Sequence, residues 1–115
     1  MIVYPDNTRS ICWPYQADQM VNTLYLTDSV EVAYELTEVR TGHGLKPMYR
    51  TGQAPTATLD AVRDEAHRVL ALAFGEDGAK KRKSVEQMRD DIGKLWTAEG
   101  VSRAQLESFL DDTSA

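Results

Sequence analysis

The sequence has few of the residues that form disulfide, metal and thiol sites, with one cysteine and two histidines among 115 residues. Cys12 has no intrachain partner, which excludes a disulfide framework and favours a reducing compartment. No run of about 18 apolar residues occurs, and the N-terminus has neither a basic segment nor a long apolar one. We therefore expect no membrane span, no export signal and a cytoplasmic location.

Positive charge is also scarce, since 13 basic side chains face 18 acidic ones and the net charge is −5. Such a chain has no general attraction to phosphate backbones, so nucleic acid is not an expected partner. His43 and His67 have no cysteine or carboxylate at a ligand-like spacing, so we expect no metal site. The basic run at 80–83 opens an amphipathic segment and is interpreted as a solvated face.

What the sequence does contain is the composition of a soluble globular protein, with 42% hydrophobic and 27% charged residues. Its length suits one compact domain. Residues 1–10 read as an irregular lead-in, residues 11–112 as the domain and residues 113–115 as a polar tail.

The first part of the domain predicts strand, helix, strand. The apolar run at 10–13 is stopped by Pro14, which is typical of a strand end. From Ala17 apolar residues recur at helical spacing until Asp28 and Ser29. The segment 30–36 then alternates with a period of two and places Glu31 and Glu35 on its second face. This pattern predicts a strand that is covered on one side only, near a sheet edge.

The segment 40–58 has no period and contains three glycines and two prolines. A loop of this length is uncommon in a compact domain unless it is functional, disordered or packed against another part, and we favour packing. The triplet Arg-Thr-Gly occurs at 40–42 and again at 50–52. It is either a coincidence between two turns or a true repeat.

The remainder predicts three helices. The first follows Thr58 as N-cap and is closed by Gly75 with Gly78. The second covers about 79–98 and ends at Gly100. The third begins at Ser102 with capping-box spacing and is expected to bury Leu106, Phe109 and Leu110. Two strands are too few to cover the apolar stripes of the first two helices, so we expect exposed apolar surface there.

The segment Trp13-Pro14-Tyr15-Gln16-Ala17-Asp18-Gln19-Met20-Val21-Asn22 carries the most chemistry. Asp18 and Gln19 fall in the first turn of a helix that follows a strand end, where α/β sheets bind ligands. A carboxylate accepts from sugar hydroxyls, and an amide both accepts and donates, so the pair can hold a hexose. Alternatively, Asp18 is only an acid favoured by the helix dipole, an effect of about 0.3–1 kcal/mol.

The pattern W-P-x-x-x-D-Q-x-x-N resembles the end of the signature box of the UDP-glycosyltransferases, and Trp13, Pro14, Asp18, Gln19 and Asn22 all match it. The resemblance extends over roughly residues 11–112 and is similar to fungal members. It implies an α/β fold, namely the C-terminal part of a Rossmann-like domain in a two-domain (GT-B type) enzyme, with about two strands and three to four helices. It also implies metal-independent chemistry with a UDP-sugar as donor substrate and no cofactor.

Carried over by position, the resemblance implies that Asp18 and Gln19 hydrogen-bond the donor hexose. Trp13, Pro14 and Asn22 would support the site, with Asn22 bracing the loop and Trp13 packing against the sheet. The implied function is the donor-sugar-binding, C-terminal portion of an enzyme that transfers a hexose to a hydroxyl of a small-molecule acceptor.

Two parts of the family's machinery have no counterpart in the sequence: the upstream diphosphate-binding segment and the N-terminal domain with its catalytic histidine. His43 and His67 do not match that histidine, so we expect no catalytic residue here and no activity of the chain alone. A competing hypothesis is a small acidic helical module that binds a protein partner and no ligand.

Overall fold

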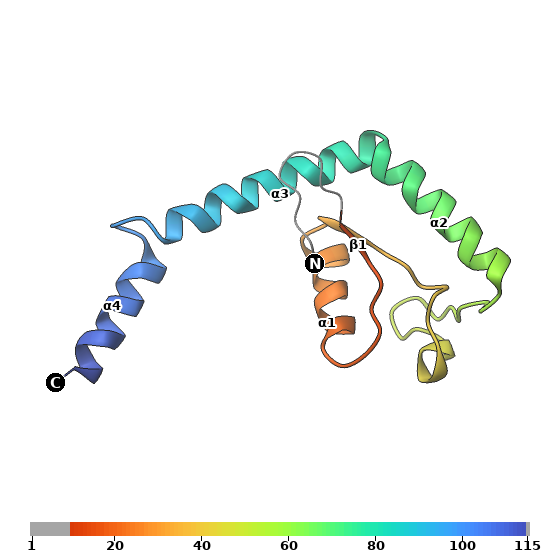
Figure 1. Cartoon of the computed structure of the whole chain (residues 1–115), viewed down its shortest axis with the longest axis horizontal. Coiled ribbons are helices and arrows are strands. Elements are labelled where there is room, and N and C mark those ends of the chain that lie inside the picture. The colour runs from red at the N-terminus through yellow and green to blue at the C-terminus, as the bar shows by residue number, and fades with distance from the viewer. Residues whose placement is uncertain (1–9, 115) are drawn as a thin grey trace. The chain divides into compact units, whose positions relative to one another are not determined.

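The computed structural model describes residues 10–114, which form a mixed α/β structure (Figure 1). Its elements, in chain order, are β1 (Ser10–Cys12), α1 (Gln19–Leu24), a π-helical turn (Tyr25–Ser29), β2 (Ala33–Glu35), a 3-10 helix (Gly42–Leu45), α2 (Leu59–Phe74), α3 (Glu76–Leu95) and α4 (Val101–Thr113). The predicted α/β class is therefore confirmed for the described residues, which combine helices with a parallel pair of strands. The chain divides into two compact units, Met1–Arg82 and Lys83–Ala115, and each is described by itself.

The described part of the first unit begins with a strand–helix–strand motif. β1 and β2 pair in parallel, with Ser10 opposite Ala33 and Cys12 opposite Glu35. Parallel strands need a crossover connection, and α1 with its π-helical turn supplies it, ending at Ser29 as predicted. β2 is shorter than the predicted strand at 30–36.

The prediction that β2 is covered on one face only is wrong. Ala33 on the second face is 2% exposed, and the Glu35 side chain is 7% exposed. The cover comes from the loop that follows, because Arg40 and Arg50 both form ion pairs with the Glu35 carboxylate. The long loop is thus packed against the sheet, and its charged partners allow Glu35 to be buried.

Helix α2 closes the small core of this unit. Thr58 is its N-cap, as predicted, and its Oγ1 accepts from the Ala61 backbone N–H at 3.1 Å. Val69 and Ala73 are buried against Tyr34 of β2. Most of the predicted apolar stripe remains outside this core, and Leu59, for example, is exposed.

A buried carboxylate fastens the chain after β2 to α2. Glu65 accepts from the Thr37 hydroxyl at 2.7 Å and from the backbone N–H groups of Thr37 and Glu38 at 2.9 and 2.8 Å. Glu38 in turn accepts from the backbone N–H groups of Thr56 and Ala57. These bonds satisfy backbone donors in an aperiodic segment, which gives the loop a defined path.

The prediction that Gly78 helps to close α2 is wrong, because α3 already begins at Glu76 and includes Gly78. Gly75 alone separates the two helices, as the C-cap of α2. The first turn of α3 passes so close to Ala73 that a Cβ on Gly78 would lie 1.8 Å from its carbonyl oxygen. Glycine is required here for close approach, not as a helix breaker.

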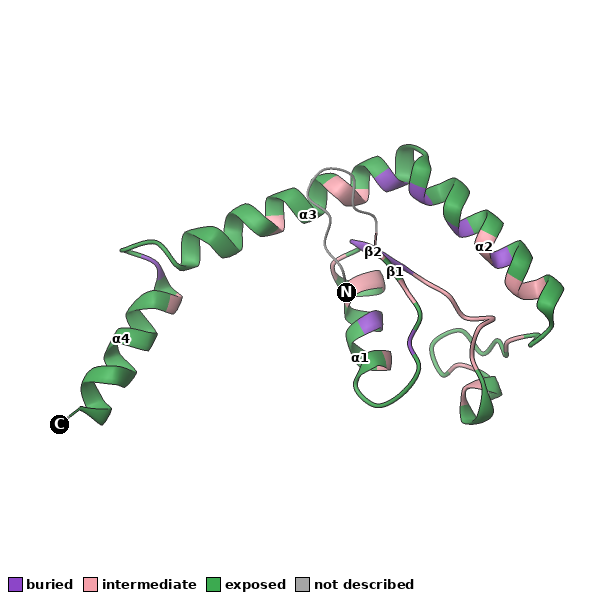
Figure 2. Cartoon of the chain, in the orientation of Figure 1, coloured by how far each residue is buried: buried purple, intermediate pink, exposed green. Residues whose placement is uncertain are grey.

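The second unit contains the end of α3 and the whole of α4. The predicted capping box at Ser102 is wrong, because α4 begins at Val101 with Gly100 as N-cap and no side-chain cap bond. Its predicted buried residues are also exposed, namely Leu106, Phe109 and Leu110. Figure 2 shows both helices exposed along most of their length. The predicted exposed apolar surface is confirmed for the described residues.

Candidate functional site

The connection from β1 to α1 is a strained turn. Ala17 has φ 55°, in the left-handed region, where a residue with a Cβ pays about 1–2 kcal/mol. The helix therefore starts later than the predicted Ala17, with Asp18 at the N-cap and Gln19 as its first residue. Backbone strain of this kind gathers at ligand sites when the surrounding structure enforces it.

Asp18 is exposed, and although it occupies the N-cap position, its side chain forms no capping hydrogen bond with the helix backbone. Its Oδ2 instead accepts a hydrogen bond from Nδ2 of Asn22 at 3.0 Å, one helical turn further on. The carboxylate is thereby oriented and keeps its other lone pairs for hydroxyl donors.

Gln19 is fixed through one end of its amide. Its Oε1 accepts from the backbone N–H groups of Tyr15 and Gln16 at 2.9 and 3.3 Å. Among residues 10–114 its Nε2 donates no hydrogen bond, so this end of the amide remains available as a donor. In this conformation the amide therefore both braces the turn and presents donors.

A cavity of about 240 Å³ lies beside these residues, at the carboxyl end of β1. Its lining residues are Cys12, Trp13, Pro14, Gln19, Asn22, Thr23 and Leu26. Four of the five predicted site residues are among them, and Asp18 is not. The volume is below the about 300–1,000 Å³ that is typical of small-molecule sites.

Trp13 does not pack against the sheet as expected. Its side chain is 65% exposed, whereas the following Pro14 is buried. The strand ends at Cys12, so Trp13 lies outside the sheet ladder. The indole therefore forms part of the cavity wall with an open side.

Cys12 and Thr23 line the cavity but were not singled out by the sequence pattern. Burial raises the pKa of the Cys12 thiol and the charge of Glu35 raises it further, while a hydrogen bond with Thr23 opposes both effects. The thiol therefore stays protonated at neutral pH. Because the thiolate is the nucleophile, Cys12 acts here as a packing residue and not as a reactive group.

Neither histidine lines the cavity beside Gln19. Across the described residues no group of three or more histidine, cysteine or acidic side chains is arranged to hold a metal ion. No helix among residues 10–114 combines the length and apolar character needed to cross a membrane.

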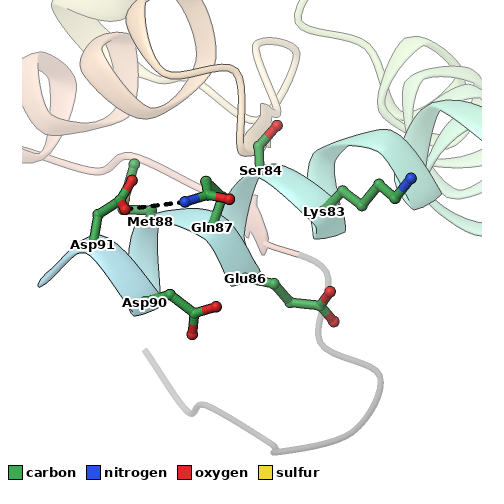
Figure 3. A pocket seen from close by; sticks show the side chains of 7 residues that line it. All are labelled: Lys83, Ser84, Glu86, Gln87, Met88, Asp90 and Asp91. Atoms are coloured by element: carbon green, nitrogen blue, oxygen red, sulfur yellow. Dashed lines mark hydrogen bonds between the residues drawn. The ribbon is translucent and has the colours of Figure 1, made fainter. Parts of the chain in front are cut away.

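A larger hollow of about 720 Å³ lies along α3 (Figure 3). All of its lining residues come from that single helix, between Lys83 and Asp91. Gln87 donates to Asp91 at 3.0 Å within this set, so part of its polar capacity is used locally. Groups from one helix do not converge on a common point, and this hollow is not a candidate site.

A charged cluster around the end of β2 was not predicted from the sequence. Glu35 pairs with Arg40 and Arg50, and Arg50 reaches Asp28 at 3.1 Å. Burial opposes the charge of Arg50, but the hydrogen bond and attraction of Glu35, joined by Asp28, outweigh it and raise the pKa of Arg50. The repeated Arg-Thr-Gly triplet was the available signal, because each copy supplies one of the two arginines.

Sequence comparison relates the chain to the UDP-glycosyltransferases, which confirms the resemblance inferred from residues 13–22. The relative is the UDP-glycosyltransferase eriJ of Hericium erinaceus, which is 38% identical over 103 residues. This match covers 88% of the chain, and the chain spans about a fifth of the length of that relative. No protein-family profile matches the chain, and no solved structure matches it.

Proposed function

We propose that the chain is the C-terminal, donor-sugar-binding portion of a UDP-glycosyltransferase that transfers a hexose to a hydroxyl of a small-molecule acceptor. The observation that carries this proposal is the coincidence of the family resemblance with a cavity at the end of β1. The parallel β1–α1–β2 unit supports a part of a Rossmann-like domain, and the GT-B type rests on the family resemblance alone.

In this proposal Asp18 accepts hydrogen bonds from two neighbouring hydroxyls of the hexose, held in place by Asn22. Nε2 of Gln19 donates to the oxygen of a third hydroxyl while Oε1 holds the turn. Charge-assisted hydrogen bonds of this kind contribute about 1.5–3 kcal/mol each. In this proposal the UDP-sugar is the donor substrate, and the chemistry requires no metal and no cofactor.

The remaining steps need groups that we assign to another part of the enzyme. A general base must come within about 2.6–3.2 Å of the acceptor hydroxyl, and the leaving diphosphate needs hydrogen-bond donors. His43 and His67 do not line the cavity beside Gln19, and neither is a proposed hexose contact. We therefore expect no sugar transfer by the 115-residue chain alone.

Ligand-observed NMR with UDP-glucose and the 115-residue chain tests the proposal. We expect binding near about 1 mM, or −4 kcal/mol, with the hexose protons receiving the most saturation. Asp18→Ala should abolish that signal. Asp60→Ala is the matched control, because Asp60 is also an exposed acid at the start of a helix but belongs to α2 instead of α1. Saturation that is confined to uridine, or unchanged by Asp18→Ala, would contradict the proposal.

A second candidate function rests on the exposed apolar side chains of α3 and α4, such as Ile92 and Phe109. These faces suit a helical module that binds a protein partner without any ligand. The same NMR experiment separates the two functions, because the module predicts no saturation of any part of UDP-glucose.

A further inference from the structure

A second cavity, of about 470 Å³, lies in the first unit and takes no part in the proposed donor site. It lies within the about 300–1,000 Å³ range of small-molecule sites. Residues of α1, β2 and the following loop line it, among them Val21, Leu24, Glu35, Arg40, Tyr49 and Arg50.

Helix α1 separates the two cavities. Successive residues of an α-helix are rotated by about 100°, so Gln19, Asn22 and Thr23 share one face. Met20, Val21 and Leu24 share the opposite face. The first face lines the smaller cavity and the second face lines the larger one, so the two have no residue in common.

Two guanidinium groups and one carboxylate form the charged part of this lining. The Glu35 side chain is 7% exposed, and those of Arg40 and Arg50 are 13% and 28% exposed. Asp28 forms an ion pair with Arg50, but the Asp28 side chain is 53% exposed, so solvent screens its charge. The sheltered charge at this point is therefore positive.

The same group has more hydrogen-bond donors than acceptors. Each guanidinium carries five N–H donors, and the single Glu35 carboxylate cannot accept from both sets. Nε of Arg40 is buried and has no partner among residues 10–114. A buried donor without a partner destabilises the protein, so an oxyanion bound here gains a hydrogen-bond donor that the free protein leaves unused.

The rest of the lining is mainly apolar. Val21, Leu24 and Tyr49 are large hydrophobic residues, and all three are exposed. Tyr49 extends fully into solvent at the edge of the cavity, where it can close over an apolar ligand.

We propose that this cavity binds a small apolar carboxylic acid. The carboxylate is held by the N–H groups of Arg40 and Arg50 that Glu35 leaves open, and the body lies against Val21, Leu24 and Tyr49. Arginine favours this class of ligand because its planar fork matches the two oxygens of a carboxylate. The site is independent of the proposed donor contacts at Asp18.

The test compares 1-naphthoate with 1-naphthamide, which has the same shape without the charge, by NMR titration of the 115-residue chain. We expect the acid to bind at least about tenfold more tightly than the amide. The largest shift changes should fall on residues of α1 and the segment 40–50. Equal affinity for the two probes, or shift changes at other positions, would overturn the proposal.

Two matched pairs of variants locate the charge and the apolar wall. Val21→Asp adds a carboxylate at the exposed rim and should weaken 1-naphthoate binding about tenfold relative to Val21→Asn, which has the same shape. Tyr49→Ala should weaken it about three- to tenfold, whereas Tyr25→Ala, outside the lining, should not. Asp18→Ala should leave the affinity unchanged, so failure of the donor site and failure of this site are distinguishable. Equal affinities within both pairs would overturn the proposal.

Discussion

Nδ2 of Asn22 donates a hydrogen bond to Oδ2 of Asp18 at 3.0 Å across one turn of α1. The sequence pattern assigns Asn22 a bracing role, and this bond is a geometry by which it could brace the site. It fixes the rotamer of an exposed carboxylate that would otherwise be mobile in water. Pre-orientation of this kind lowers the entropic cost of holding a sugar.

Glu65 should be a main determinant of the stability of the first unit. Glu65→Ala leaves the N–H groups of Thr37 and Glu38 without their acceptor, and we expect a loss of about 2–4 kcal/mol in the free energy of unfolding. Urea denaturation followed by circular dichroism measures it.

The matched control is Arg63→Ala on the same helix. Arg63 forms an exposed ion pair with Asp60 at 3.1 Å, so its loss should cost less than about 1 kcal/mol. If both variants change the free energy of unfolding by the same amount, the Glu65 bonds do not hold the segment after β2.

Cys12 should react slowly with alkylating reagents. Burial and the charge of Glu35 raise the pKa of the thiol, so the rate of iodoacetamide labelling should rise at a higher pH than for free cysteine. Thr23→Val removes the opposing hydrogen bond and should raise that pH further. Because the pKa of Cys12 is raised in the folded protein, the protonated thiol contributes to the stability of the fold. This contribution is fully present below the unfolded pKa of the thiol and is lost as pH rises through its folded pKa. A labelling midpoint at or below that of free cysteine would contradict the environment described for Cys12.

The exposed apolar side chains should make the chain bind hydrophobic dyes or self-associate at micromolar concentration. Ile92 and Phe109 are more than half exposed. Ile92→Glu with Phe109→Glu should reduce both effects, whereas a compact monomer that binds no dye would show that these faces are covered in solution. Dye fluorescence and light scattering measure the two effects.

The sequence predicted the elements whose signals are local. Thr58 and Gly75 mark the ends of α2 through cap chemistry that acts within a few residues, and the change from strand to helix near Pro14 follows from periodicity. The motif at 13–22 could be identified because its residue types and spacing match a known family.

Features that depend on long-range contacts could not be predicted in the same way. Glu35 reads as a solvent-facing residue by alternation, and only its pairing with Arg40 and Arg50 from a later loop explains its burial. Gly78 reads as a helix breaker, but a close approach to Ala73 requires it inside α3. In both cases the deciding partner lies outside the local pattern.

The most direct measurement of the central claim is the effect of Asp18→Ala on catalysis in a chimeric enzyme. Residues 11–112 would replace the matching segment of the Hericium erinaceus relative, and kcat/KM would be measured over a panel of UDP-hexoses and acceptors. We expect Asp18→Ala to lower kcat/KM for the donor about 10- to 100-fold, because it removes a charge-assisted hydrogen bond to the hexose. Asp60→Ala should leave it unchanged. A chimera that is active and keeps its full kcat/KM after Asp18→Ala would contradict the assignment of Asp18 as a donor-sugar contact.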